Sequence, residues 1–372
     1  MKYALLVVSL MSFAQIGWMQ STEITTIETG ETTLAATEQK KKIKNQEITE
    51  EDQVRLTFEG ISAGDLTMAK KYWFPQMAFR YNKDGENALT LAIQLDNAEI
   101  VTWLEDHSII NLKNKAGETP LTLAIKKGNP EIIEIIVQRA KGSLRNELGE
   151  TPIVLAMQHY DRLDFIQTLI QRGADLNMRS LGVTPLSKAV ELNKLPIVAM
   201  LLKNGADPNM PNTDGTLPMT IAVEANREAM VGMLLFHSSQ PQKDANWKSK
   251  LGEPLLVTAA KSGQAIVVKT LLSYGAYPNS TDYMDNTALL MAAQQGNTTM
   301  MQVLVENGAD VNHINILGIT PVLAAAESGQ YAAASYLANN GANLETRSYA
   351  GLAPTDFYSF SGNTNTTLPD KP

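Results

Sequence analysis

Apolar residues occur along most of the chain in short runs at helical spacing, separated by polar turns that contain glycine and proline. In one unit, Gly182-Val183-Thr184-Pro185-Leu186 combines a glycine suited to a tight turn, a threonine that can cap a helix and a proline suited to the first helical position. A second run, Ile197 to Leu202, is apolar at helical spacing and stops at Gly205-Ala206-Asp207-Pro208-Asn209. The pattern predicts two short helices per unit, each followed by a turn.

This unit recurs at a nearly constant step. The residues at the first helical position, which we call anchors, are separated by 32, 32, 33, 33, 37, 33, 33 and 33 residues. A glycine (or Asp285 in one unit) lies three residues before each anchor, and an alanine lies four residues after the first eight. The anchors are Ala88, Pro120, Pro152, Pro185, Pro218, Leu255, Ala288, Pro321 and Pro354. Such a period predicts a solenoid, because each unit buries its apolar face only by stacking on its neighbours.

The units resemble the ankyrin repeat, whose pattern G-x-T-P-L-H-x-A-A-x-x-G-H is followed by G-A-D-x-N. The resemblance covers about residues 50–360 and implies an all-α solenoid of paired antiparallel helices with hairpin-like loops. It predicts about nine repeats, including a degenerate N-terminal cap. The family's histidine, two residues after the proline, is absent throughout. Its place is taken by Thr90, Thr122, Val154, Ser187, Thr220, Val257, Leu290 and Leu323. We expect the threonines and the serine to bond backbone groups across the turn, which valine and leucine cannot do.

Three features set the limits and the irregularity of the array. Gly64-Asp65-Leu66 matches a turn between helices, so the capping unit has its first helix from about Glu50 to Gly60. The last unit begins at Gly351 and stops at Phe360, and residues 361–372 are expected to form a disordered tail. The 37-residue step contains four extra residues, which we expect in a longer loop around residues 238–246.

The N-terminal part has a different composition. In residues 1–20, Lys2 precedes an apolar run to Leu10, which looks like a bacterial-type secretory signal peptide. An uncleaved membrane anchor and a cytoplasmic protein with an unusual N-terminus are the alternatives. Residues 21–49 are rich in threonine, glutamate and lysine and have few large apolar residues, which predicts a flexible linker.

Composition and motifs argue against a catalytic or metal-binding site in this chain. A formal net charge of −8 disfavours non-specific binding of nucleic acid, and the absence of cysteine excludes disulfides and cysteine-based zinc sites. Gly60-Ile61-Ser62-Ala63-Gly64 matches a serine-nucleophile motif by letters, but it falls in the capping repeat and not between a strand and a helix. The four histidines have no metal-ligand spacing. We therefore expect no catalytic residue, no cofactor, no metal and no evident small-molecule substrate.

We therefore expect the function to depend on residues at the surface of the array. In the ankyrin family, partners usually bind the concave side, which is formed by hairpin tips and the exposed ends of the first helices. The tip positions lie five, four and two residues before each anchor, and the helix positions lie six and seven residues after it. Leucines that recur at one tip position suggest contacts between successive hairpins. The candidate partner-binding residues are Tyr283, Met284, Ile316, Ile319, Tyr349, Leu352, His159, Lys126 and Lys127.

Three interpretations of the C-terminal apolar residues stay open. They form an interface, or the tail from Phe357 to Pro372 folds back and covers them, or they are scattered exposed residues without a common role. The leading functional hypothesis is a non-enzymatic module for binding a protein partner, exported from a bacterial cell to the periplasm or beyond. The alternatives are an accessory subunit or inhibitor of an enzyme, and an effector that acts on host proteins.

Overall fold

The computed structural model describes residues 48–249 and 251–357. Contacts divide the chain into two units, Met1–Gln53 and Val54–Pro372, and the repeats lie in the second. The predicted signal peptide, most of the predicted linker and the predicted tail lie outside the described residues. Within the described residues, no helix combines the length and the apolar character needed to cross a membrane.

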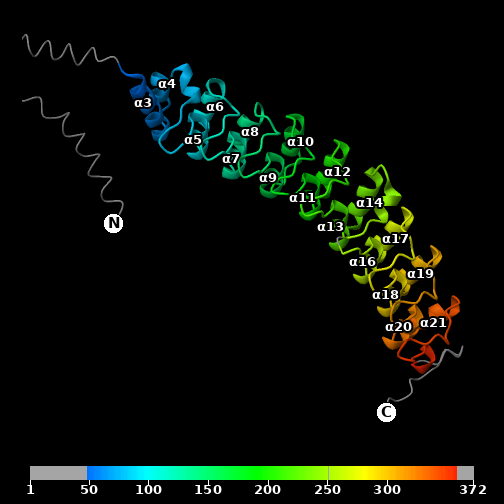
Figure 1. Cartoon of the computed structure of the whole chain (residues 1–372). Coiled ribbons are helices and arrows are strands. Elements are labelled where there is room, and N and C mark those ends of the chain that lie inside the picture. Colours follow the sequence, from blue (N-terminus) through cyan, green and yellow to red (C-terminus); the bar gives the residue numbers. More distant parts are fainter. Residues whose placement is uncertain (1–47, 250, 358–372) are drawn as a thin grey trace, which may run out of the picture. The chain divides into compact units, whose positions relative to one another are not determined.

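The second unit is a stack of helix pairs. Figure 1 shows the pairs following one another in chain order. The first helices of the pairs, which we call inner helices, pack each on the next. They are α5 (Ala88–Gln94), α7 (Pro120–Lys127), α9 (Pro152–His159), α11 (Pro185–Glu191), α13 (Pro218–Glu224), α16 (Leu255–Lys261), α18 (Ala288–Gln294) and α20 (Pro321–Glu327). The predicted all-α solenoid is confirmed.

The second helices of the pairs form the outer row. They are α6 (Ala98–His107), α8 (Pro130–Val137), α10 (Leu163–Gln171), α12 (Leu195–Lys203), α14 (Glu228–His237), α17 (Ala265–Ser273), α19 (Thr298–Glu306) and α21 (Tyr331–Asn339). Each packs on its own inner helix and, apart from α8 with α10, on the next outer helix. Apolar residues of both rows form one continuous core, since the pairs have no other way to remove their apolar faces from water.

The predicted register is confirmed residue by residue. Every anchor from Ala88 to Pro321 is the first residue of an inner helix, and Pro354 begins the 3₁₀-helix η2 (Pro354–Asp356). Asp285, which replaces the usual glycine, has φ 58°, the left-handed conformation that aspartate tolerates better than most residues. All eight alanines four residues after an anchor are fully buried. These alanines keep neighbouring inner helices close together.

The substitutes for the family's histidine behave in two ways. Thr90 and Thr122 each form a reciprocal capping box, with Asn87 and Thr119 respectively. At Leu290, only the backbone amide is bonded, to the hydroxyl of Thr287. The prediction was wrong for Ser187, because its buried hydroxyl has no hydrogen-bond partner.

The N-terminal cap consists of α3 (Glu50–Ala63), α4 (Leu66–Tyr72) and the 3₁₀-helix η1 (Pro75–Phe79). Asp65 caps α4 by accepting from the amide of Met68 at 2.9 Å. Gly60 lets the two helices approach, since a Cβ there would lie 2.7 Å from the backbone nitrogen of Ala69. Ser62 lies exposed in the last turn of α3 and not in a strand-to-helix turn. Gly60 of the serine motif is therefore explained by packing, and Gly64, with φ 71°, by the turn between α3 and α4.

The insertion differs from the predicted loop. Residues 241–245 form the short helix α15 (Pro241–Ala245), which packs against α14. Ala245 is 1% exposed and belongs to the core. The carboxylate of Asp244 accepts from Nδ2 of Asn209 at 2.8 Å and also from the hydroxyl of Ser238. The extra residues were predicted as a loop because their own sequence shows no apolar periodicity. In the structure, buried Ala245 and the hydrogen-bonded carboxylate of Asp244 hold them against the array.

Candidate functional site: the hairpin tips and the inner-helix ends

The hairpins are built by one recurring polar residue, six residues before the anchor in most repeats. Asn114 is typical, since its side-chain oxygen accepts from the amide of Glu118 across the turn at 2.8 Å. Asn146, Asp282 and Asn315 make the same bond to the residue two before the anchor, at 2.9 Å each. This side chain fixes the hairpin, and it places the residues four and five before the anchor at the tip.

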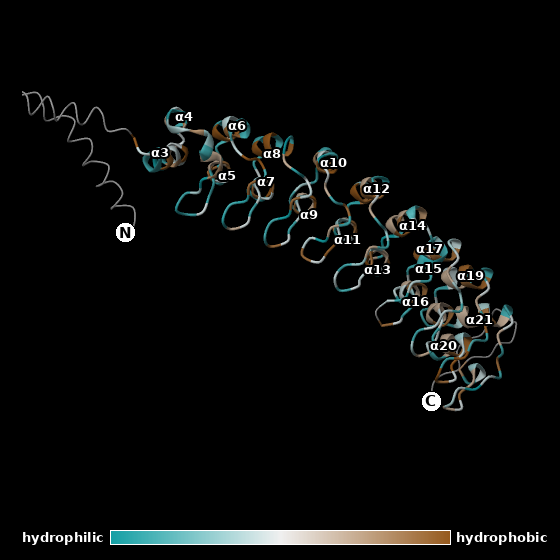
Figure 2. Cartoon of the chain, turned by 45° about the horizontal axis from the view of Figure 1, so that its top comes forward, coloured by the Kyte–Doolittle hydropathy of each residue, from teal (hydrophilic) through white to brown (hydrophobic). Residues whose placement is uncertain are grey.

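Backbone hydrogen bonds join successive tips. The amide of Lys115 donates to the carbonyl oxygen of Gly85 at 2.8 Å, and Glu147 makes the same contact with Gly117 at 3.0 Å. In the last repeats Ile316 bonds Met284 and Tyr349 bonds Leu317, at 3.2 and 3.1 Å. The tips of successive repeats are therefore direct neighbours. Figure 2 shows the hairpin loops side by side along one edge of the helices.

Lys126 was predicted as a partner-binding residue, and the structure gives it an intramolecular role. Its Nζ lies 2.7 Å from Oε1 of Glu118 and also contacts the carboxylate of Glu150, so it bridges two hairpins. Burial lowers the pKa of Lys126, but its bonds to Glu118 and Glu150 outweigh burial and raise it. Burial raises the pKa of Glu118, yet its bonds from Lys126, Asn146 and Thr122 lower it overall.

Lys261 occupies the same position on α16 and also joins two repeats. Its Nζ lies 3.2 Å from Glu253 of its own hairpin and 2.9 Å from Asp282 of the next. In the repeats of α7 and α16 the sixth residue after the anchor thus meets the second residue before it, and in the repeat of α5 Gln94 does so with Glu86 at 2.5 Å. This pairing was not predicted, although counting offsets from the anchors reveals it.

Lys127 and His159 are exposed, as predicted for the surface that the inner-helix ends form. The ring of His159 lies 6.3 Å from that of Tyr160. The hydroxyl of Tyr160 donates to the carbonyl oxygen of Ile125 at 2.8 Å, and burial raises its pKa. Tyr160 is therefore a link between repeats, whereas His159 and Lys127 are available to a partner.

The six predicted C-terminal residues divide by exposure. Tyr283 and Tyr349 are 78% and 81% exposed, and Ile316 and Leu352 are 45% and 38% exposed. Met284 and Ile319 are half-buried, and Ile319 packs against the core. We call Tyr283, Ile316, Tyr349 and Leu352 the C-terminal tip patch.

The exposure of the recurring tip leucines contradicts the expectation that they form contacts between successive hairpins. Leu148 and Leu181 are 66% exposed, Leu251 is 86% exposed and Leu317 is 49% exposed. Exposed leucines therefore recur at this tip position from Leu148 to Leu317, with the polar Asp214 in one hairpin between them.

Leu181 has a strained backbone as well. Its φ is 50°, that of Gly182 is 88°, and Ser180 and Val183 exchange two backbone hydrogen bonds of 2.8 and 3.0 Å around them. Two consecutive residues with positive φ, flanked by a pair of residues that are hydrogen-bonded to each other, are typical of a type I′ turn. This turn favours asparagine or aspartate at its first central position. A bulky leucine there is unfavourable for folding, and it is exposed.

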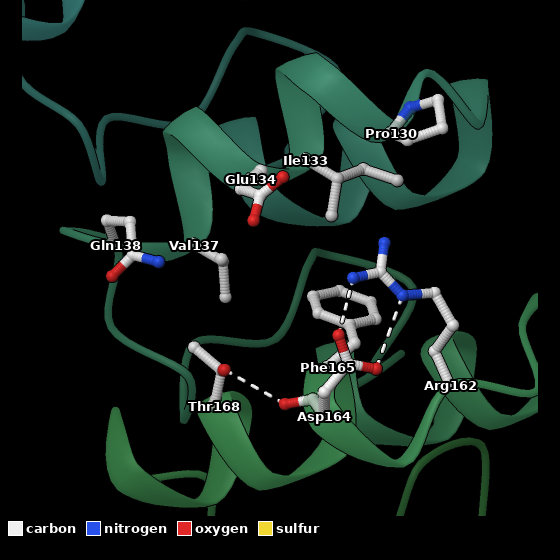
Figure 3. Close-up of a pocket in the computed structure, with 9 residues that line it drawn as sticks. All are labelled: Pro130, Ile133, Glu134, Val137, Gln138, Arg162, Asp164, Phe165 and Thr168. Atoms are coloured by element: carbon white, nitrogen blue, oxygen red, sulfur yellow. Dashed lines mark hydrogen bonds and ion pairs between the residues drawn. The ribbon is translucent and has the colours of Figure 1, made fainter.

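Two hollows in the surface offer no catalytic arrangement. The first lies between α8 and α10, and Figure 3 shows Ile133 and Phe165 on its walls with the Arg162–Asp164 ion pair at its edge. Its volume of about 40 Å³ admits a few water molecules only. The second is an open groove of about 490 Å³ between the turns before α12 and α14. In the part of the chain that the structure describes, no three histidine, aspartate or glutamate side chains are grouped to hold a metal.

The comparison with protein families agrees with this geometry. The family model for ankyrin repeats, described as three copies, matches residues 60–146, 140–212, 186–282 and 256–348. No curated protein matches the chain. Since the matched segments cover well over half of the sequence, the chain belongs to the ankyrin repeat family, whose repeats are protein–protein interaction modules.

Proposed function

We propose that this chain binds a protein partner through its hairpin tips and inner-helix ends, with the exposed apolar tip residues as the principal contacts. The observation that carries the proposal is Leu181, a leucine that is 66% exposed and has φ 50°. Neither feature favours folding, and strained backbone at an exposed position is often retained for function.

The rest of the tip row supports the same proposal. Tyr283 and Tyr349 are more than three-quarters exposed, and tyrosine is enriched among residues that dominate binding energy. Aligned apolar side chains on an exposed surface are typical of an interaction site. His159 and Lys127 add polar contacts at the ends of α9 and α7.

The test compares the wild-type chain with the double variant Tyr283→Ser/Tyr349→Ser in affinity capture followed by mass spectrometry. Both side chains are exposed, so the melting temperature should stay almost unchanged while the captured partner is lost. The control is His313→Ala, a half-buried residue at the base of a tip hairpin. A double variant that captures the same partner as the wild type would place the interface elsewhere.

We also propose that the chain acts after export across a membrane. The basis is Lys2 followed by the apolar run to Leu10. Fusion of residues 1–50 to a reporter that is active only outside the cytoplasm should give activity, and deletion of residues 3–14 should abolish it. Activity of a cytoplasm-specific reporter with the intact fusion would contradict export.

A further inference from the structure

The outer row of helices has an unusual residue where it meets the insertion. Phe236, the ninth residue of α14, is 75% exposed. In the six other outer helices that reach nine residues, the ninth residue is polar and exposed. These residues are Asp106, Gln171, Lys203, Ser273, Glu306 and Asn339. The repeat therefore does not require an apolar side chain at this position.

Tyr277, in the loop after α17, departs from a second repeated feature. At the same place in four other repeats, the side-chain oxygen of an aspartate or asparagine accepts a hydrogen bond from the amide two residues later, at 2.8 or 2.9 Å. These residues are Asp175, Asp207, Asp310 and Asn343. Tyrosine cannot make this local bond, because its hydroxyl lies at the far end of the ring. The loop thus lacks one hydrogen bond and carries instead an aromatic side chain that is 59% exposed.

The helix of the insertion contacts both regions. It packs against α14, and the side chain of Gln242 lies against Gly275, where a Cβ would be 3.0 Å from its Cγ. Asn246, directly after α15, accepts from the amide of Tyr277 at 2.7 Å, so the Cα atom of its neighbour Trp247 lies within about 11 Å of the Cα atom of Tyr277. Trp247 is itself 39% exposed. Three exposed aromatic residues therefore lie around one short helix.

We call Phe236, Trp247 and Tyr277 the insertion patch, and its surroundings carry cations without partners. Lys243 lies exposed on α15, and Lys203 lies exposed at the ninth position of α12, the outer helix that packs on α14. Among residues 48–249 and 251–357, neither ammonium group has a hydrogen-bond or ion-pair partner.

The charge of this part of the chain differs from that of the whole. Residues 203–279 contain 7 lysines and arginines and 6 aspartates and glutamates, a net charge of +1, whereas the whole chain has −8. A short segment of a partner meets the local charge, because charges more than about 10 Å away are largely screened. An anionic membrane would instead face the acidic array over a wide area, which is unfavourable. The charges therefore favour an acidic protein segment.

We propose that the insertion patch is a second interaction surface, which binds a segment of a protein partner that carries aspartate or glutamate beside a large apolar side chain. The apolar side chain packs on the aromatic residues of the patch, and the carboxylate pairs with Lys243. Exposed aromatic residues that gather on one surface are typical of binding sites, and complementary charge adds specificity. This surface lies at the outer row and is separate from the hairpin tips.

The test uses displayed libraries of short random peptides, selected on the full-length wild-type chain and counter-selected on Phe236→Gln/Tyr277→Asn. Both substitutions copy residues that hold the same positions in other repeats, Gln171 and Asn343, so the double variant should melt at the same temperature or higher. The enriched peptides should carry aspartate or glutamate next to a large apolar residue. Their affinity should fall about tenfold or more in Lys243→Glu, because an attractive contact becomes repulsive.

Two matched controls lie elsewhere on the array. Ile266→Ser removes a side chain that is 59% exposed near the other end of α17, and Lys141→Glu reverses an exposed charge in the loop after α8. Neither substitution should change the affinity of the enriched peptides. An equal loss in Lys141→Glu would reduce the effect of Lys243 to net charge and would overturn its pairing with the partner.

The other outcomes separate this inference from the proposed function of the tips. If no peptide distinguishes the wild type from the double variant, the inference is overturned and binding at the tips is unaffected. Peptides that lose affinity in Tyr283→Ser/Tyr349→Ser would belong to the tips and would also overturn it. A lower melting temperature of the double variant would show that the aromatic residues stabilise the array instead. Binding of the wild type, but not of the double variant, to vesicles of anionic phospholipid would assign the patch to a membrane and overturn the protein partner.

Discussion

The side-chain oxygen of Asn246 accepts a hydrogen bond from the backbone amide of Tyr277 at 2.7 Å. Asn279 makes the same bond with the amide of Asp310, and Asn312 makes it with that of Asn343, each at 2.7 Å. Nδ2 of Asn246 also donates to the carbonyl oxygen of Gly275 at 2.9 Å. Asn177 makes the same kind of bond with the amide of Asp207 before the insertion. The link between repeats is thus present again at Asn246, directly after α15, so the four extra residues do not interrupt the stack of repeats.

Asn246→Ala should therefore destabilise the array at the junction between α14 and α17. The change removes three hydrogen bonds, of which the one to the carbonyl oxygen of Gly275 is partly buried, and should cost about 1 kcal/mol of the free energy of unfolding. Chemical denaturation measures the loss. The control is Asn340→Ala, which removes only an exposed bond to the carbonyl oxygen of Tyr336. Equal losses in both variants would mean that the junction has no special importance.

The fold was predictable from the sequence because its determinants are local and repeated. Gly182, Thr184, Pro185 and Ala189 each have one task within a repeat, and every task recurs at the same offset. The insertion was not predictable, since a single buried alanine, Ala245, and the bonds of Asp244 decide its packing. A contribution from one irregular contact has no periodic signal.

The candidate site was predictable in part. The offsets correctly brought Tyr283, Ile316 and Tyr349 onto neighbouring tips, because identical offsets align along a solenoid. They did not distinguish a side chain that points outward from one that is paired within the array. Lys126 looked available and is bridged by two glutamates, whereas Leu148 looked structural and is exposed. That difference depends on side-chain partners in the next repeat.

The buried alanines between inner helices offer a test of the register. Ala189 is fully buried, so Ala189→Asp would place an unpaired charge in the core and should cost on the order of 3–5 kcal/mol. Ala350→Asp, at an exposed tip, should cost little. Thermal melting distinguishes them, and similar shifts for the two variants would contradict the assigned register.

The bridge formed by Lys126 predicts a pH dependence of stability. The pKa of Glu118 is lowered in the folded state, so its stabilising contribution is complete above its ordinary value of about 4.3 and is lost as the pH falls below it. The pKa of Lys126 is raised, so its contribution is complete below about 10.4 and is lost as the pH rises above that value.

Lys126→Met should therefore cost about 1 kcal/mol at neutral pH and should weaken both the acidic and the alkaline loss of stability. The measurement is the free energy of unfolding as a function of pH. Lys127→Met is the matched control, because it removes the same charge from the adjacent exposed residue. If the two variants gave the same pH profile, the bridge to Glu118 and Glu150 would have no energetic role.

Leu181 allows stability and binding to be separated within one substitution. Leu181→Asn places asparagine before Gly182, the pair that a type I′ turn favours, and should raise the free energy of unfolding by up to about 1 kcal/mol. The same change removes an exposed apolar contact, so capture of the partner should weaken. Leu148→Asn is the matched control, since Leu148 holds the same tip position and is also 66% exposed, but its φ is not positive. It should weaken capture without the gain in stability. Loss of stability in Leu181→Asn would mean that the leucine packs against the array, and the argument from strain at an exposed tip would fail.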